Sequence, residues 1–353
     1  MSTFPIWMLL TARVPPLAIA IAAVLAGASL SRADDASQAR IVEVRRIWDA
    51  APHNAFTDLV WRDGHWFCVF REGAKHVSPD GALRVLSSTD GATWSSSALI
   101  RSTDSDLRDA KISIAPGNRL MLCGAGALHE PVNGMRHQSY VWYSEDGRDW
   151  GEPIPIGDPG FWLWRIVWHD DIAYAVGYST ALDRSTRTTR LYRSTDGRTF
   201  EVIVPELNGA GRSPGESSLL FDSDGSSLCI VRHDDPKEPA ALLGSSRSPY
   251  REWTWKSLQT RLGGPQVIRL PDGRLVVGGR DSIGPPECNL WWLDPETAKL
   301  TTLATLPSGG DTSYPGLVFR DGLLWVSYYS SHEEKTSIYL AKVKLPDASD
   351  ATR

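Results

Sequence analysis

A pattern of two short strands joined by a tight turn occurs six times in this chain of 353 residues. In its clearest copy, residues 313–332, the pair Asp321-Gly322 separates two runs of β-branched and aromatic residues. Asp-Gly in such a setting is a strong signal for a β-hairpin. The other copies lie at residues 56–71, 112–124, 165–178, 218–232 and 266–280. Successive turn positions (64, 117, 171, 225, 273 and 322) are 53, 54, 54, 48 and 49 residues apart.

A repeat of about 50 residues built from short strands is typical of a β-propeller, in which each repeat is one blade. The six copies predict an all-β, six-bladed propeller of four-stranded antiparallel blades, folded as one domain over residues 34–353. The 15 tryptophans suit the flat interfaces between such blades. Because the last repeat ends with a third strand at 337–345, we expect the extended run at 39–48 to supply its fourth strand and close the ring.

The first 33 residues have the pattern of a cleavable signal peptide. Arg13 precedes an apolar run that ends in small residues, with cleavage expected after Ala33. An uncleaved membrane anchor is the alternative. Cleavage predicts a secreted or periplasmic monomer that makes no stable membrane insertion once the leader is removed.

The charge balance and the cysteines restrict the partners. The chain has 42 acidic and 37 basic residues, two of the basic ones in the leader, so residues 34–353 carry a net charge of −7. This acidic balance argues against a nucleic-acid partner. Cys68, Cys123 and Cys229 lie in the second strands of different hairpins, and Cys288 lies in a loop, so we expect buried thiols rather than disulfides. No residue pattern suggests a cofactor or a metal.

A second phrase, Ser-x-Asp-Gly-x-x-aromatic, occurs at 88–94, 144–150 and 194–200, with a degenerate copy at 246–253. Its Ser and Asp can accept hydrogen bonds from nearby backbone amides while Gly adopts a positive φ. The phrase resembles the Asp-box, or BNR repeat, of the sialidase-like (exo-α-sialidase) six-bladed propellers. The resemblance spans about residues 40–345. It implies a structural role for these turns, at the outer edge of the blades.

The hairpin geometry predicts where a functional site lies. If the Asp-Gly turns occupy one rim of the ring, the start of each first strand and the end of each second strand meet at the opposite rim. Polar side chains gather at these positions and can converge on one pocket. Arginine side chains at equivalent strand ends can bind a carboxylate through two parallel hydrogen bonds from the planar guanidinium group, which favours an anionic sugar as the ligand. The candidates for substrate binding are Arg71, Arg165, Arg232, Arg280 and His332.

Four further residues are candidates for the chemistry, three of them through the resemblance to sialidases and Asp109 through its position at the rim. Tyr314 matches the position of the nucleophile at the start of the last hairpin. Glu216 resembles the carboxylate that accepts the tyrosine proton, because a phenol with a pKa near 10 needs such a base. Sialidases are a known exception to the two-carboxylate scheme of glycosidases. The acid/base candidates are Asp109, which opens the second hairpin, and Asp80, on the loop that carries the acid in sialidases.

The sequence departs from the family pattern in the first blade. Sialidases carry an Arg-Ile-Pro tripeptide there, whose arginine binds the substrate carboxylate, whereas this chain has Ala-Phe-Thr-Asp at 55–58. The leading interpretation is an exported, sialidase-like glycoside hydrolase acting on an anionic sugar. The alternatives are a non-catalytic propeller that binds glycans or proteins, and a hydrolase or lyase for a neutral sugar that uses Asp58 or Asp109.

Overall fold

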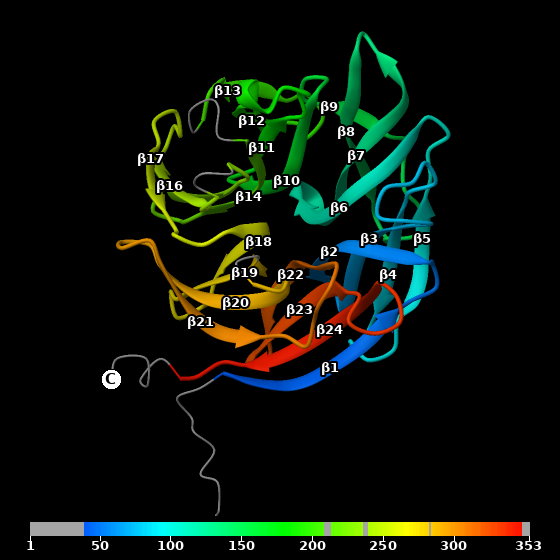
Figure 1. Ribbon diagram of the computed structural model, residues 1–353, viewed down its shortest axis with the longest axis vertical. Coiled ribbons are helices and arrows are strands. Elements are labelled where there is room, and N and C mark those ends of the chain that lie inside the picture. The colour runs from blue at the N-terminus through cyan, green and yellow to red at the C-terminus, as the bar shows by residue number, and fades with distance from the viewer. Residues whose placement is uncertain (1–38, 208–212, 236–238, 282–283, 348–353) are drawn as a thin grey trace, which may run out of the picture. The chain divides into compact units, whose positions relative to one another are not determined.

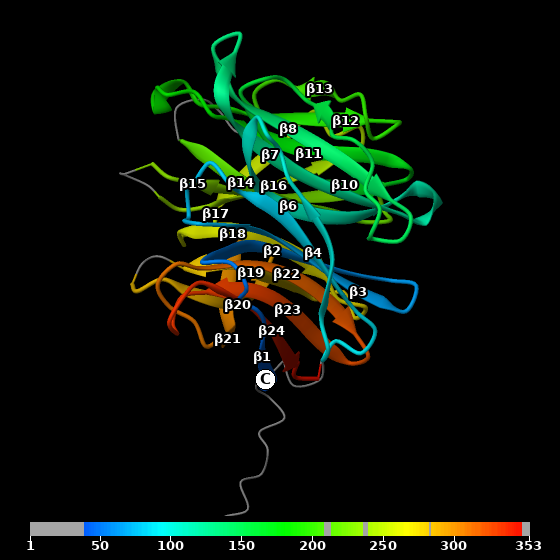
Figure 2. The ribbon, with the colours of Figure 1, turned by 90° about the vertical axis from the view of Figure 1, so that its right-hand side faces the viewer.

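Six four-stranded antiparallel sheets make up the part of the chain that the computed structural model describes, residues 39–207, 213–235, 239–281 and 284–347. The sheets follow one another around a centre in sequence order (Figure 1), and a view from the side shows their strands stacked across the ring (Figure 2). The six-bladed propeller predicted from the repeat is therefore confirmed. The predicted leader at 1–33 lies outside the described residues.

Each blade begins with its innermost strand, and the innermost strands of neighbouring blades contact one another. Blade one consists of β2 (His53–Arg62), β3 (His65–Gly73), β4 (Ala82–Ser88) and β5 (Ser95–Ile100). Blade two consists of β6 (Ser105–Ala115), β7 (Arg119–Val132), β8 (Met135–Ser144) and β9 (Ile154–Ile156). Blade three consists of β10 (Phe161–His169), β11 (Ile172–Ser179), β12 (Thr189–Ser194) and β13 (Glu201–Val204). Blade four consists of β14 (Pro214–Phe221), β15 (Ser226–His233), β16 (Leu242–Arg247) and β17 (Thr254–Ser257). Blade five consists of β18 (Leu262–Arg269), β19 (Leu275–Asp281), β20 (Glu287–Asp294) and β21 (Lys299–Thr305). Blade six consists of β22 (Thr312–Arg320), β23 (Leu323–Ser330), β24 (Ser337–Lys344) and β1 (Arg40–Trp48).

The ring closes where the two ends of the described chain meet. Strand β1 pairs with β24 in antiparallel fashion, from Arg40 opposite Lys344 to Trp48 opposite Ile338, as the outermost strand of blade six. The segment at 39–48 thus occupies the place expected from the sequence. This pairing covers the edge of β24, which would otherwise expose a row of unpaired backbone groups.

Polar side chains of the inner strands tie neighbouring blades together near the centre. Each accepts a hydrogen bond from a backbone N–H of the next blade, and each is buried. These hydrogen bonds between blades explain why the otherwise apolar inner strands carry buried polar residues. They are Asp58 Oδ2 to Ile112 N (2.9 Å), Ser218 Oγ to Val267 N (3.0 Å) and Gln266 Oε1 to Leu317 N (2.7 Å).

The hairpin turns and the Ser-x-Asp-Gly turns share one rim, which we call the turn rim. In the first of these turns, Asp90 Oδ1 accepts from the backbone N–H groups of Ala92 and Thr93, both at 2.8 Å. Gly91 has a φ of 67°, and a Cβ at this position would clash with the ring of Trp325 from blade six. Only glycine fits there, since an L side chain would meet both strain and a neighbouring blade.

All four cysteines are free and buried. Burial raises the pKa of the Cys123 and Cys288 thiols to about 12, so both are neutral near pH 7. They fill space in the blades as small apolar groups.

The described residues contain two three-residue 3-10 helices, η1 (Pro116–Asn118) and η2 (Arg184–Thr186). A membrane-spanning helix needs about 20 apolar residues. No helix within these ranges is long and apolar enough to span a bilayer.

Candidate active site

Every innermost strand carries a β-bulge near the rim opposite the turn rim, so we call this second rim the bulge rim. At each bulge, two residues of the inner strand face one residue of the second strand. Bulges interrupt the alternation of side chains and re-aim them, and they are frequent beside active sites. The six pairs are Phe56-Thr57, Asp109-Ala110, Trp164-Arg165, Gly215-Glu216, Gly264-Pro265 and Tyr314-Pro315.

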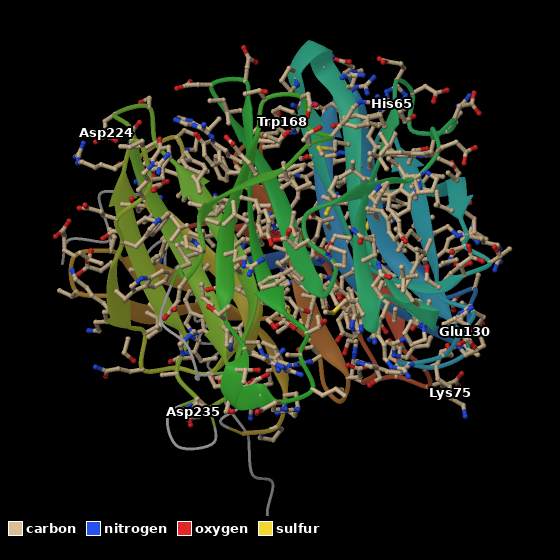
Figure 3. The ribbon with its side chains drawn as sticks, turned by 90° about the horizontal axis from the view of Figure 1, so that it is seen from above. His65, Lys75, Glu130, Trp168, Asp224 and Asp235 are labelled. Carbon is tan, nitrogen blue, oxygen red and sulfur yellow. The ribbon has the colours of Figure 1, made fainter. Side chains whose placement is uncertain are left out.

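The two rims lie on opposite sides of the molecule. Figure 3 shows His65, Trp168 and Asp224 along one edge and Lys75, Glu130 and Asp235 along the other. His65 follows the first hairpin turn, whereas Lys75 follows the end of β3, so the first edge is the turn rim and the second is the bulge rim. Loops that border the bulge rim therefore surround the six bulges.

Tyr314, Glu216 and Arg232 form one hydrogen-bonded group at the bulge rim. The Tyr314 hydroxyl donates to Glu216 Oε1 at 2.7 Å. Arg232 Nη1 lies 2.8 Å from both oxygens of that carboxylate and 3.1 Å from the Tyr314 oxygen. Tyr314 is 6% exposed and Glu216 8% exposed. Residues from blades four and six thus meet as the sequence predicted, with a phenol and a carboxylate in direct contact.

The electrostatics of this group assign the proton to the tyrosine. Burial disfavours the charge of Glu216, but Arg232, the Tyr314 hydroxyl and Arg280 outweigh burial and lower the pKa of Glu216. Burial and the neighbouring Glu216 charge raise the pKa of Tyr314. The resting pair is therefore a neutral phenol against a carboxylate, which is the arrangement in which Glu216 can accept the phenolic proton.

Aromatic rings hold Tyr314 in place. The rings of Phe56 and Trp164 meet it edge-on at centroid distances of 5.1 and 5.6 Å, and Tyr329 lies at 5.8 Å. Tyr314 has a φ of 51°, which is uncommon for a residue other than glycine and marks local strain. Gly264 leaves room for the ring, because a Cβ there would lie 2.5 Å from Tyr314 Cγ. The nucleophile candidate is therefore pre-positioned by packing.

Arg280 lies beside the same ring with hydrogen-bonding capacity to spare. Its guanidinium carbon is 5.3 Å from the centroid of Tyr314. Among the described residues, its side chain makes one long hydrogen bond, from Nη1 to the carbonyl oxygen of Thr312 at 3.5 Å. A guanidinium has five N–H donors. Arg280 can therefore offer donors to an anionic ligand at the bulge rim.

Arg108 is a second cation at this site, and our sequence analysis did not predict it. Its guanidinium lies 5.6 Å from the centroid of Phe56 and donates to the carbonyl oxygen of His76 at 3.2 Å. Its Nε is buried and makes no hydrogen bond within the described ranges. Arg108 was missed because it opens no hairpin and ends none. The sequence signal that could have identified Arg108 is its position directly before the candidate acid Asp109.

Asp109 is a buried carboxyl group that can hold a proton near neutral pH. It is 6% exposed, has a φ of 55° and has no hydrogen-bond partner in the described part of the chain. Burial raises the pKa of Asp109 to about 6, although Arg108 and Lys111 act in the opposite direction. Its charge also interacts with that of Glu216. These properties suit a general acid.

Arg71 and Asp80, also predicted for the site, hold a loop instead. The side chain of Arg71 is fully buried, and its Nη2 lies 2.8 Å from Asp106 Oδ1. It also donates to the carbonyl oxygens of Lys75 (2.8 Å) and Ser78 (3.1 Å). Asp80 accepts two hydrogen bonds from the backbone N–H of residue 74, at 3.0 and 3.2 Å. The structure does not bring either side chain into contact with Tyr314 or Glu216.

Arg165 and His332 also point elsewhere. Arg165 Nη1 pairs with Asp58 Oδ2 at 2.6 Å and borders a central cavity of about 490 Å³ whose other lining residues include Trp61 and Trp168 near the turn rim. His332 is exposed, accepts or donates a hydrogen bond with Ser330 at 2.8 Å, and packs on Tyr339. Neither is joined to the Tyr314 group by a hydrogen bond.

Comparison with known proteins places the chain among propellers but in no family. No protein-family model and no curated protein matches it. Similar solved structures include a Dyadobacter fermentans protein of unknown function, with a TM-score of 0.77 and 19% identity over 87% of this chain and 99% of that one. At these levels of identity the likeness shows the fold alone.

Two further structural neighbours are glycosidases by name. Trypanosoma rangeli sialidase, solved with 2,3-difluorosialic acid as a covalent intermediate, matches with a TM-score of 0.62 and 13% identity over 86% of this chain and 57% of that one. Penicillium chrysogenum α-L-arabinanase, solved with arabinobiose, matches with a TM-score of 0.66 and 12% identity over 85% and 98%. The class that the fold defines is thus a six-bladed propeller with sialidase and arabinanase propellers among its neighbours.

Proposed function

We propose that this protein is an exported retaining glycoside hydrolase of the sialidase type, which cleaves a terminal sugar that carries a carboxylate. The observation that carries the proposal is the 2.7 Å hydrogen bond from the Tyr314 hydroxyl to Glu216, in a group that also includes Arg232 and has Arg280 beside the Tyr314 ring. Export rests on the predicted leader alone.

In the first step, the Tyr314 oxygen attacks the anomeric carbon while its proton passes to Glu216 Oε1. The bond from the anomeric carbon to the leaving oxygen breaks, and protonated Asp109 gives its proton to that oxygen. Because the pKa of Tyr314 is raised and that of Glu216 is lowered, proton transfer is unfavourable in the resting enzyme. It becomes favourable only as positive charge develops on the sugar, so the pair reacts when substrate is in place.

In the second step, water attacks the anomeric carbon of the glycosyl-tyrosine. Asp109, now ionised, accepts a proton from that water, and Glu216 returns its proton to the departing Tyr314 oxygen. Both carboxyl groups are then in their starting states. A neutral phenol as nucleophile avoids a carboxylate facing an anionic sugar, which is the physical advantage of tyrosine for such substrates.

The arginines account for the charge of the proposed substrate. Arg280 keeps N–H groups that the described residues leave unused, beside the Tyr314 ring. Arg108, whose buried Nε lies 4.0 Å from Asp106 Oδ2, adds a second cation beside the Phe56 ring. Two such forks can bind a carboxylate by charge-assisted hydrogen bonds. Arg108 thereby offers a cation near Phe56, where the sialidase pattern has the arginine that this chain lacks.

A neutral sugar is the second candidate, favoured by one observation. The bulge rim holds two carboxyl groups of different character, Glu216, whose pKa is lowered, and Asp109, whose pKa is raised, which is the pattern of an ordinary two-carboxylate glycosidase. The likeness to an arabinanase propeller agrees with this alternative.

The test is a substrate panel followed by covalent trapping. Purified protein is assayed on fluorogenic α-sialosides, uronides and α-L-arabinofuranosides, and fluorinated analogues of the best substrate are then used to trap the intermediate. We expect turnover of a carboxylate-bearing glycoside and a mass increase on a peptide containing Tyr314. A trapped adduct on Glu216 would support the neutral-sugar mechanism. Absence of turnover on the whole panel, with ligand binding retained, would favour a carbohydrate-binding propeller.

A further inference from the structure

Two histidines and an aspartate converge near the Tyr314 group without taking part in the proposed reaction. His53 Nε2 lies 2.9 Å and His76 Nδ1 2.6 Å from the same oxygen, Asp311 Oδ2. Their three donor atoms all lie within 4.8 Å of one another. His53 is buried, Asp311 is partly buried, and His76 is exposed, so solvent and small ions can reach the group.

The three residues come from separate segments that meet where the ring closes. His53 begins β2 in blade one, His76 lies in the loop after β3, and Asp311 directly precedes β22 in blade six. A β-bridge between His53 and Thr336 crosses the same seam. No spacing in the sequence groups these residues, which is why sequence analysis predicted no metal. Only the closed propeller brings them together.

The aspartate is oriented as a metal-binding carboxylate usually is. Tyr329 donates its hydroxyl proton to Asp311 Oδ1 at 2.9 Å, which leaves Oδ2 directed at the two imidazoles. The backbone N–H of Asp311 donates to Ser331 Oγ at 2.8 Å. Ligands that bind metals are commonly held in this way by outer hydrogen bonds, which fix the ligand atom and maintain its charge.

We propose that His53 Nε2, His76 Nδ1 and Asp311 Oδ2 bind a divalent transition metal ion of the Zn²⁺ type. Two imidazole nitrogens and one carboxylate oxygen suit zinc and its neighbours, whereas calcium and magnesium prefer oxygen donors alone. Tetrahedral zinc places such donors roughly 3.3 Å apart. The present separations of 2.6 and 2.9 Å require a small movement, which the exposed side chain of His76 can make.

The ion would brace one wall of the candidate active site. The Phe56 ring lies 5.1 Å from the His76 ring and 5.1 Å from the Tyr314 ring, so it links the metal group to the nucleophile candidate. A bound ion would also join blade one to blade six beside the ring closure. The principal consequence is therefore stabilisation of the folded ring, since an ion that binds only the native state raises its stability.

The test uses full mature protein made without a polyhistidine tag, stripped with EDTA and dialysed. Calorimetric titration with ZnCl₂ is expected to show one strong site, and excess Zn²⁺ to raise the melting temperature by about 5 °C at 100 times its Kd. Ca²⁺ and Mg²⁺ at the same concentration are expected to leave the melting temperature unchanged. Equal shifts with all three ions would overturn the assignment of a nitrogen-rich site.

Three variants identify the ligands. His76→Ala and Asp311→Asn should each weaken Zn²⁺ binding by roughly 100-fold and abolish the thermal shift, while keeping the wild-type circular dichroism spectrum. His65→Ala is the matched control, because His65 is an exposed histidine on the turn rim. It should bind Zn²⁺ as the wild type does. Unchanged affinity in His76→Ala, or no strong site in the wild type, would show that these residues form a hydrogen-bond network only.

Discussion

The two rims of this propeller use polar side chains in opposite ways. On the turn rim, Asp146 accepts hydrogen bonds from the backbone N–H groups of Arg148 and Asp149, and Ser144 accepts from Gly147, so these polar groups are satisfied locally. On the bulge rim, Asp109 has no hydrogen-bond partner among the described residues, and Arg280 has one long hydrogen bond. The difference indicates that the turn rim serves stability, whereas the bulge rim retains unused polarity for a ligand.

The same contrast separates two arginines at equivalent strand ends. Arg71 and Arg280 both follow the apolar part of the second strand of their blade. Arg71 is buried against Asp106 and two backbone carbonyl oxygens. Arg280 lies over the ring of Tyr314 and is partly exposed. Equivalent positions in the repeat thus carry the same residue type in different roles. Arg71, which has an ion pair with Asp106, is structural, whereas Arg280, which has none within the described residues, can bind a ligand.

The largest effect is expected from the nucleophile candidate. Tyr314→Phe removes one oxygen but keeps the ring that packs on Phe56 and Trp164, so the fold should be unchanged. We expect kcat to fall by roughly 10⁴-fold, and Glu216→Gln to behave similarly. The double variant should be little worse than either single variant, because the two act as one unit. Wild-type kcat in Tyr314→Phe would exclude the covalent mechanism.

The sequence predicted the fold and the central pair for a physical reason. Alternating hydrophobic strands and tight turns repeat at nearly constant spacing, which specifies blades and their closure. Once the turns are assigned to one rim, Tyr314, Glu216 and Arg232 must lie at the other. The structure brings these three within hydrogen-bond distance.

The remaining site residues depend on contacts that spacing does not encode. The burial of Arg71 depends on Asp106, 35 positions away, and Arg165 turns to Asp58, 107 positions away. Sequence analysis gave all such arginines the same role, because their acidic partners lie in other blades. The bulges were equally hidden, since a two-against-one pairing changes side-chain direction without changing the hydrophobic pattern.

The second effect concerns Asp109 and pH. If it is the general acid, activity requires its protonated form, so kcat/KM should fall as pH rises above about 6 and also below the lowered pKa of Glu216. Asp109→Asn should lower kcat by roughly 10³-fold on substrates with poor leaving groups and remove the alkaline limb. An unchanged pH profile in Asp109→Asn would assign the acid to another group.

Stability provides an independent readout of the same residue. The pKa of Asp109 is raised in the folded state from 3.8 to about 6, so folding favours the protonated carboxyl group. As pH rises from about 4 to 6, the unfolded chain gains charge before the folded one does, and stability is lost. Asp109→Asn should therefore be more stable than the wild type above pH 6, by up to about 3 kcal/mol. Denaturant unfolding of both proteins at pH 4 and pH 8 measures the difference, which should be small at pH 4 and largest at pH 8.

The two equivalent arginines should respond differently to the same substitution. Arg280→Ala is expected to raise KM about 100-fold for an anionic substrate, equivalent to ~3 kcal/mol, with little change in melting temperature. Arg71→Ala leaves Asp106 buried without its partner, so it should lower stability by roughly 3–5 kcal/mol. A neutral substrate analogue is the control, since Arg280→Ala should not weaken its binding. Equal loss of affinity for both substrates would show that Arg280 does not bind a carboxylate.

The smallest effect is expected on the turn rim. Asp146→Ala removes the acceptor for two backbone N–H groups, much as the loss of a helix-capping side chain does, so it should cost about 1 kcal/mol of folding stability. The aromatic contact survives, because Trp150 Nε1 still donates to the carbonyl oxygen of Gly147. Catalytic constants should stay within a factor of two of wild type, since the turn lies on the rim opposite Tyr314. Thermal unfolding and kcat/KM measured on one preparation test both expectations, with Asp149→Ala in the same turn as the matched surface control, because the Asp149 side chain is exposed and accepts no hydrogen bond within the described ranges. A large loss of activity without loss of stability would show that the two rims are coupled. It would contradict the assignment of stability to the turn rim and of ligand binding to the bulge rim.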